Sequence, residues 1–191
     1  MKTSFYEEDE LKQLGLNSYG ENVLISRLCS IYGAENISLG SNIRIDDFAT
    51  ITSTLNQTVI GDYFHLGLSS SIMGGNIFVG NFVTVSTKVS IFSISDDYFG
   101  NSLSVCVGIP DDFRNMYSGR VEIGDHVNIG PHSIVVPDII ISSVVSIGAN
   151  SFVNKNCDSF GIYAGTPAKR IKEKSKRCLE LEQSFRGLSN D

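Results

Sequence analysis

Residues 121–153, VEIGDHVNIGPHSIVVPDIIISSVVSIGANSFV, decide the fold of this chain. Aliphatic residues recur there every six residues, at Ile123, Ile129, Val135, Ile141, Ile147 and Val153. Neither the 3.6-residue period of a helix nor the two-residue period of a strand produces this spacing. Each aliphatic must therefore return to the same place on a coiling backbone, which predicts a parallel β-helix.

The same period extends back towards the N-terminus in groups of three. These groups are Tyr19, Ile25 and Ile31; Leu39, Ile45 and Ile51; Ile60, Leu66 and Ile72; and Val79, Val85 and Ile91. They predict about six coils, each with three short strands and one inward aliphatic per strand. The period breaks between Ile91 and Ile123, so residues 93–120 should form a long excursion loop. A loop of this length in a regular domain is usually functional or disordered.

Composition fits one domain with a single core. The chain has 191 residues, 41% of them hydrophobic, and its 18 glycines suit tight corners. A net charge of −6 argues against nucleic acid as a partner. We expect no signal peptide, no membrane span and a cytoplasmic location. The four cysteines show no C-x-x-C spacing, so we expect reduced thiols.

Helical segments are expected at both ends. Ser4 and Glu7 form a predicted capping box, so residues 1–18 should make a short helical lid on the open end of the prism. The β-helix itself should span residues 19–166. Pro167 is expected to open a helical tail over residues 167–191, whose apolar stripe packs on the prism or on a neighbouring subunit.

The repeat, its interruption and the stretch YAGTPAKRIK at residues 163–172 resemble the hexapeptide-repeat acyltransferases. The resemblance covers nearly the whole chain. It is strongest to the galactoside and maltose acetyltransferases and to the sugar acetyltransferases of surface-polysaccharide synthesis. It implies an all-β, left-handed parallel β-helix and a homotrimer with active sites between prisms. It also implies acetyl-CoA as co-substrate and transfer of acetyl to a hydroxyl or amino group of a sugar or sugar nucleotide.

A basic run near the C-terminus supports the coenzyme independently. Residues 169–177 hold six Lys or Arg against one Glu in an otherwise acidic protein, and such cations bind phosphates well. A solvated helix face is the alternative interpretation. Carried over by position, the resemblance implies coenzyme contacts from Ala149, Asn154, Lys155, Thr166, Lys169 and Lys172. Residues 137–142 depart from the family pattern because they lack two glycines.

The sequence offers more than one candidate for the catalytic group. Acyl transfer needs a base for the acceptor's proton, and His is the natural choice near neutral pH. The galactoside branch has its catalytic His where this chain has Asp96, which a second carboxylate, Asp97, follows. We rank His126 first among the histidines because it should lie beside both the loop and the coenzyme groove. His65 is the next candidate, whereas His132, one hexad after His126, should point from another side of the prism.

Candidate sugar-binding residues are Asp97, Tyr98 and Arg114, all in the loop. Two other functions remain open. Three histidines on a β-helix suggest a zinc hydratase of the carbonic anhydrase type, but a six-residue spacing sends His126 and His132 to different faces, so we expect no metal. The missing family His instead favours a non-catalytic trimer that serves as a scaffold or binds acetyl-CoA without turnover.

Overall fold

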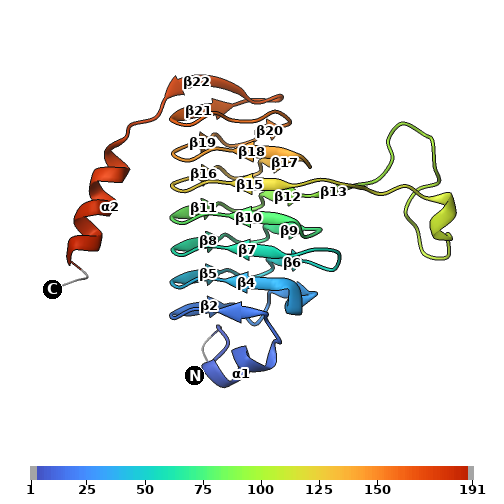
Figure 1. The fold of residues 1–191 in the computed structure, drawn as a ribbon, viewed down its shortest axis with the longest axis horizontal. Coiled ribbons are helices and arrows are strands. Elements are labelled where there is room, and N and C mark those ends of the chain that lie inside the picture. Colours follow the sequence, from blue (N-terminus) through green and yellow to red (C-terminus); the bar gives the residue numbers. More distant parts are fainter. Residues whose placement is uncertain (1–3, 189–191) are drawn as a thin grey trace.

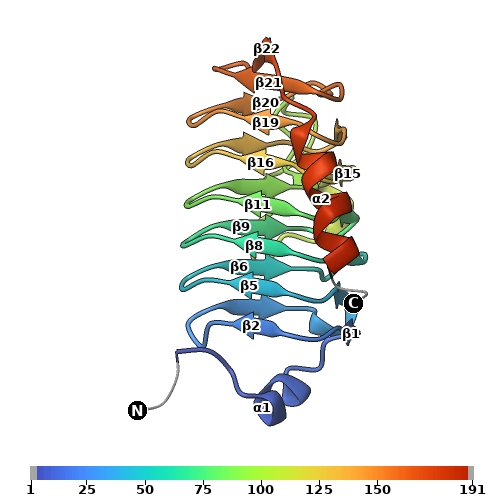
Figure 2. The same cartoon turned by 90° about the vertical axis from the view of Figure 1, so that its left-hand side faces the viewer.

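The structure, a computed structural model, describes residues 4–188. It is a stack of coils in which three parallel sheets form the faces of a prism (Figures 1 and 2), so the predicted β-helix is confirmed. The first face contains β1 (Ser18–Tyr19), β4 (Ile37–Leu39), β7 (Thr58–Ile60), β10 (Ile77–Val79), β15 (Val121–Ile123) and β18 (Ile139–Ile141).

The second face is the longest. It contains β2 (Val23–Ile25), β5 (Ile43–Ile45), β8 (Phe64–Leu66), β11 (Val83–Val85), β16 (Asn128–Ile129), β19 (Ser146–Ile147), β21 (Gly161–Ala164) and β22 (Lys169–Glu173). The third face contains β3 (Ser30–Tyr32), β6 (Thr50–Thr52), β9 (Ser71–Met73), β12 (Ser90–Phe92), β17 (Ile134–Val135) and β20 (Phe152–Val153). Six coils are therefore complete, and β21 belongs to a seventh.

The strand register stacks the predicted inward aliphatics in three columns. Val79 pairs with Ile60 below it and with Ile123 above it, and the other two faces repeat this arrangement. Every predicted inward residue is buried except Tyr19 and Ile31 in the first coil, which are half-buried. Three-residue strands of the first and second faces also bury a second side chain, whereas each strand of the third face buries at most one.

Glycines at the corners allow neighbouring coils to approach closely, whereas non-glycine residues adopt the left-handed corner conformation. Fourteen non-glycine residues of the described chain have φ between 54° and 61°, including Tyr63, Phe82 and His126 at successive corners between the first and second faces. Gly61 and Gly80 are needed there because a Cβ would come within 2.9 Å of the backbone of the next coil. The left-handed corner conformation is thus imposed by the stacked coils, while glycine allows their close approach.

The N-terminal lid is present, but its cap differs from the prediction. Helix α1 (Glu8–Gln13) begins after Glu7, whose N–H donates to the Glu10 carboxylate at 2.9 Å, so the capping box is formed by Glu7 and Glu10. Ser4 cannot be the cap because its carbonyl accepts the Arg27 N–H of the first coil. Leu11 is buried in the core, and α1 covers the open end of the prism (Figure 1).

The C-terminal segment departs further from the prediction. Pro167 does not open a helix: the chain turns there, and β22 pairs antiparallel with β21, satisfying the exposed edge of the last coil. The tail helix, α2 (Arg177–Leu188), begins ten residues later and runs along the chain's own prism (Figure 2). Residues 189–191 of the predicted tail and 1–3 of the predicted lid lie outside the described residues. No helix in the described chain is long and apolar enough to cross a bilayer.

The excursion loop, residues 93–120, leaves the corner between the third and first faces and stands clear of its own prism (Figure 1). Its root is an antiparallel pair, β13 (Ile94–Ser95) with β14 (Tyr117–Ser118). The Tyr117 hydroxyl and the Arg120 N–H both donate to the Asp138 carboxylate of the next coil. Short 3-10 helices lie at Ala34–Asn36 and, within the loop, at Asp111–Phe113.

Stability should depend on the inward columns. Ile129 is 1% exposed in the middle of the second-face column, so Ile129→Ala leaves a cavity that the stacked coils cannot close. We expect a loss of about 2–5 kcal/mol in the free energy of unfolding, measured by urea denaturation. The control Ile171→Ala, at a position 65% exposed on β22, should change this free energy by less than about 0.5 kcal/mol. Equal losses in the two variants would contradict this account of the core.

Candidate active site

Two cavities meet at the root of the excursion loop. The larger, which we call the third-face cavity, has a volume of about 670 Å³ and is lined by Met73, Phe92, Ile94, Ser95, Asp96, Tyr98, Val105, Met116, Ile134, Val136, Pro137 and Phe152. The smaller, the loop cavity, has about 240 Å³ and is lined by Ser95, Asp96, Asp97, Tyr98, Phe99, Asn115 and Tyr117. Ser95, Asp96 and Tyr98 line both, so Asp96 provides a carboxylate at the junction.

Asp96 is held in place by the loop backbone. One carboxylate oxygen accepts the N–H of Asp97 at 2.9 Å, and the other accepts the N–H of Val105 at 3.1 Å. These two bonds fix the orientation of a half-buried carboxylate whose remaining lone pairs are available to a ligand. Of the three predicted catalytic residues, Asp96 is thus the one that lines these cavities.

The predicted sugar-binding residues lie in different parts of the loop. The Asp97 carboxylate accepts the N–H groups of Phe99 and Asn101, both at 2.8 Å, and these bonds lower its pKa, so it organises the turn. Tyr98 is 87% exposed at the mouth of both cavities. Arg114 pairs with Asp111 and lines another hollow of the loop, so the structure does not bring it to Asp96.

His65 lies on the second face, away from the loop. Its Nε2 is 2.8 Å from Oδ2 of Asp46, whose other oxygen accepts the Arg44 Nε–H at 2.7 Å. Burial acts to raise the pKa of Asp46, but the hydrogen bonds from Arg44 and His65 outweigh it and the pKa is lowered. Because this carboxylate is bound to both neighbours, the arrangement is a hydrogen-bonded cluster on the outward side of β5 and β8.

His126 does not lie beside the loop, which differs from the sequence-based expectation. It occupies the corner between the first and second faces, stacks on Phe82 with ring centroids 5.0 Å apart, and is 8% exposed beneath α2. Its Nε2 is 2.6 Å from Oε2 of Glu182 in α2. Phe185 of α2 also contacts the rings of Tyr63 and Phe82 edge-on. In this environment His126 fastens the C-terminal helix to the prism.

His132 is exposed at the corner between the second and third faces, so it points from a different side than His126, as the spacing predicted. Among residues 4–188 there is no group of three or more His, Cys, Asp or Glu side chains arranged to hold a metal ion. All four cysteines are free thiols.

The predicted coenzyme contacts flank the third face above its cavity. Ala149 and Thr166 lie at its corner with the second face, where the Thr166 hydroxyl donates to the Asn150 carbonyl at 3.2 Å. Asn154 and Lys155 are exposed after β20 at the opposite edge. Lys169 pairs with Ala164 at the end of β21, whereas Lys172 lies farther along β22, opposite Ile162. An extended ligand along this face would meet the first five residues before it reaches the cavity.

The basic run divides into structural and exposed cations. The Lys174 ammonium donates to the carbonyls of His126 and Val145 at 2.8 and 3.1 Å, and burial lowers its pKa. Lys176 lies over the ring of Phe160, and Arg170 pairs with Glu173. Lys169 and Lys172 are exposed. The run is therefore a strand and a linker, not the predicted helix face, and these two lysines fit the anionic groups of a coenzyme.

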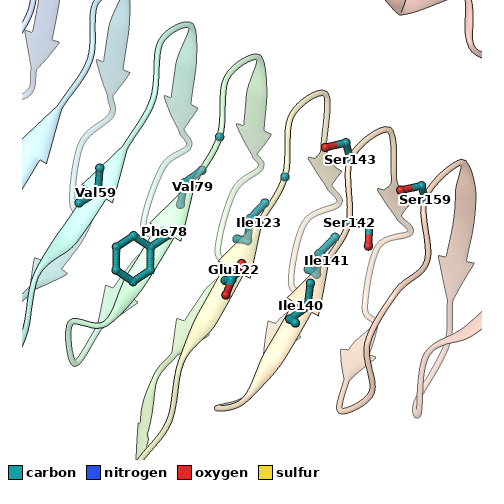
Figure 3. Close-up of a pocket in the computed structure, with 12 residues that line it drawn as sticks. Val59, Phe78, Val79, Glu122, Ile123, Ile140, Ile141, Ser142, Ser143 and Ser159 are labelled. Carbon is teal, nitrogen blue, oxygen red and sulfur yellow. The ribbon is translucent and has the colours of Figure 1, made fainter.

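Another hollow, of about 500 Å³, lies on the first face. Figure 3 shows Val59, Phe78 and Ile140 on β7, β10 and β18, with Glu122 of β15 between Phe78 and Ile140. Ser142, Ser143 and Ser159 lie towards the corner. Arg120 stacks over Phe78 and pairs with Glu122. This groove includes neither Asp96 nor a predicted coenzyme contact, and its apolar row follows outward strand positions.

The sequence analysis missed the apolar lining of the third-face cavity. Met73 and Phe92 pair with one another on β9 and β12, and Ile134 pairs with Phe152 on β17 and β20. Each is an outward residue next to a predicted inward aliphatic. Large apolar residues at outward positions of neighbouring coils could have indicated this cavity. The six-residue period, however, does not predict which face of the prism the loop lies against.

Known proteins similar to this chain are sugar acyltransferases. The dTDP-4-amino-4,6-dideoxy-D-glucose acyltransferase of Escherichia coli is 44% identical over 184 residues, which cover 96% of this chain and 95% of that protein. The putative lipopolysaccharide biosynthesis O-acetyl transferase WbbJ of Escherichia coli is 32% identical over 75% of this chain and 72% of that protein. The structure of AntD, an N-acyltransferase from Bacillus cereus, in complex with dTDP and 3-hydroxybutyryl-CoA is 37% identical, with a TM-score of 0.93 over 100% of both chains. No family model matches.

The chain belongs to the hexapeptide-repeat sugar acyltransferases. Its β-helix is left-handed like that of these enzymes. It is an acyltransferase that uses acyl-CoA as the donor and a sugar as the acceptor. The enzyme assignment therefore replaces the scaffold interpretation, which rested on the missing histidine.

The contact between α2 and the prism should depend on pH. Hydrogen bonds from Arg186 and His126 lower the pKa of Glu182 despite the opposing effect of burial. A carboxylate whose pKa is lowered by a contact stabilises that contact at pH values above 4.5, the ordinary pKa of Glu. This stabilisation is lost as the pH falls through the lowered pKa. In Glu182→Gln, amide exchange in α2 should be about tenfold faster than in wild type at pH 7, and the difference should be smaller at pH 3.5.

The control for this measurement is Glu180→Gln, since Glu180 is exposed on the same helix. This variant should exchange like wild type at both pH values. Unchanged exchange in Glu182→Gln at pH 7 would show that the pair with His126 does not hold α2.

Proposed function

We propose that this enzyme transfers an acyl group from acyl-CoA to the amino group of a dTDP-linked 4-amino-4,6-dideoxyglucose. The observation that carries the proposal is the Asp96 carboxylate at the junction of two cavities, in a chain 44% identical to an acyltransferase of that sugar nucleotide. AntD, moreover, forms complexes with dTDP-4-amino-4,6-dideoxyglucose and coenzyme A. A carboxylate is the side chain best suited to hold an amine, which favours N-acylation over O-acylation.

The two cavities allow a direct transfer. The thioester lies in the third-face cavity, and the sugar amine approaches from the loop cavity with an N–H donated to Asp96. The amine nitrogen forms a bond to the thioester carbon, the carbon–sulfur bond breaks, and the nitrogen loses a proton while the thiolate gains one. Asp96 orients the amine lone pair and accepts the hydrogen bond that strengthens as the nitrogen becomes positive.

The positions substituted in the AntD structures support a functional role for Asp96. One serine and, ten residues later, one aspartate were each replaced in that protein, and the complexes still contain coenzyme A. Ser86 and Asp96 have the same spacing here, in a chain that matches AntD from end to end. We therefore assign Asp96 to the position of that aspartate.

We also propose that three copies assemble and that the enzyme works in the cytoplasm, where acyl-CoA and nucleotide sugars are available. Tyr98, Phe99 and Val107 are 87%, 92% and 105% exposed on a loop that stands away from its own prism (Figure 1). Ile140, in the first-face groove of Figure 3, is likewise 44% exposed. Apolar surface of this kind usually marks a protein interface, and a second prism would cover both.

Asp96→Asn should lower kcat/KM for acyl transfer to the aminosugar nucleotide by about 10²–10⁴-fold. The neutral amide lacks the negative charge that stabilises the amine as its nitrogen becomes positive. The affinity for acyl-CoA should stay within about threefold. Asp112→Asn is the matched control, since it removes an exposed carboxylate elsewhere in the loop and should keep wild-type activity. Loss of activity in His126→Ala but not in Asp96→Asn would contradict this assignment.

Lys169→Ala should weaken acyl-CoA binding about fivefold, because an exposed charge-assisted contact to phosphate is lost. Isothermal titration at two salt concentrations checks this, and the difference between variant and wild type should shrink at high salt. Lys176→Ala removes a neighbouring cation that is engaged with Phe160, and it should bind like wild type.

Light scattering after gel filtration should give a mass of three times 20.8 kDa at micromolar concentration. Val107→Asp places a charge on the fully exposed tip of the loop and should shift the mass towards one copy. A wild-type mass of 20.8 kDa would refute the trimer.

A further inference from the structure

The corner at Asp138 does more than turn the chain. Asp138 stands at one of the two positions in residues 137–142 where the family pattern has glycine, and its φ is 60°. Corners of this stack adopt that conformation with many residue types, so their geometry does not call for a carboxylate. The Asp138 carboxylate instead accepts the Arg120 N–H at 2.9 Å and the Tyr117 hydroxyl. Both donors belong to the returning end of the excursion loop.

The root of the loop is held between two coils. Its ends are joined by the Gly119 N–H, which donates to the Ser93 carbonyl at 2.7 Å. From the coil below, the Asn76 side-chain amide donates to the Gly119 carbonyl at 3.0 Å. From the coil above, Asp138 binds the two donors just named, and it packs so closely on Gly119 that a Cβ there would collide with its carboxylate. The returning end of the loop is therefore fastened to the upper coil by Asp138.

Tyr117 connects this contact to Asp96. It pairs with Ser95 in the β13–β14 ladder, and it lines the loop cavity together with Asp96. The bonds that orient the Asp96 carboxylate come from N–H groups of the loop itself, so they do not fix it relative to the prism. The predicted coenzyme contacts, by contrast, lie on the prism around its third face. The distance between the Asp96 carboxylate and a bound thioester therefore depends on how the loop is fastened to the prism.

We propose that Asp138 is a positioning residue for acyl transfer. By binding Tyr117 and Arg120 it fixes the loop relative to the third face, so that Asp96 holds the amine beside the thioester. The proposal rests on the proposed function, since it requires the role given there to Asp96. A hydrogen bond to a carboxylate is roughly twice as strong as a neutral one, which suits a contact that holds an exposed loop. Misplacement of the reacting atoms by about 1 Å can slow a reaction about 10²-fold.

The test is Asp138→Gly, which removes the carboxylate and keeps a residue that adopts the corner conformation readily. We expect kcat for acyl transfer to fall by about 10- to 100-fold. The dissociation constant for acyl-CoA should stay within about twofold, and the midpoint of thermal unfolding and the mass of the assembly should not change. Asp138→Asn, whose side-chain oxygen can still accept one of the two bonds, should recover part of kcat. The control Asn42→Gly makes a similar change at a corner with a φ of 61° away from the loop, and it should keep wild-type kcat.

Tyr117→Phe tests the path by which Asp138 acts. It removes the hydroxyl but keeps the ring, so it should also lower kcat. If Asp138 acts through this hydroxyl, the double variant should lose less than the product of the two single losses. Amide hydrogen exchange supplies a readout that needs no acceptor, since the amides of β13 and β14 should exchange about tenfold faster in Asp138→Gly than in wild type.

Wild-type kcat in Asp138→Gly would overturn the proposal, and so would a loss of kcat matched by a lower thermal midpoint or a smaller assembly. Independent losses in Asp138→Gly and Tyr117→Phe would overturn the path through Tyr117. Amide formation by the wild-type enzyme on the dTDP-linked aminosugar tests the proposed function separately, and its absence would refute that function. The exchange measurement would then still decide the further proposal, because unchanged exchange in Asp138→Gly would show that Asp138 does not fix the loop.

Discussion

The structure depends on the stacking of one coil on the next. Each strand from β1 to β20 is only two or three residues long and cannot bury its inward aliphatic alone, so Ile60, Val79 and Ile123 are buried by each other in a column. That requirement fixes the register, the coil length and the close approach of backbones at Gly61 and Gly80. It also holds residues such as Val144 in a left-handed corner conformation that a β-branched side chain rarely adopts.

Because the inward residues alone maintain the stack, the outward residues are free to differ between faces. The first and third faces carry large apolar side chains such as Phe78 and Phe92, while the second carries polar groups, including the cluster of Arg44, Asp46 and His65. The excursion loop leaves the corner where the steps between coils already vary in length. An insertion at such a surface corner adds little to the entropic cost of loop closure, and it leaves the inward columns intact. One regular scaffold can thus position a catalytic loop without losing stability.

The role proposed for Asp96, where the galactoside branch has a histidine, has a chemical reason. A hydroxyl acceptor must lose its proton to become a good nucleophile, and this calls for a base such as histidine. A neutral amine already has a reactive lone pair, so a carboxylate that orients it is sufficient. Asp96 is oriented in turn by the N–H groups of Asp97 and Val105, which belong to the loop itself. The histidine that the sequence favoured, His126, is engaged with Glu182 and Phe82 at another corner.

The sequence by itself determined the β-helix, its inward columns and the place of the loop, because each follows from a short-range period or from its interruption. Asp96 and the predicted coenzyme contacts came from the family resemblance. Five of those six predicted contacts lie around the third face, since positions in a repeat map directly onto corners. Only the tertiary structure decided that Pro167 precedes a strand, that α2 folds back over His126, and that Met73, Phe92 and Met116 enclose a cavity with Asp96. Those contacts join residues whose separation in sequence follows no period, so they depend on how the loop and the tail pack against the finished prism.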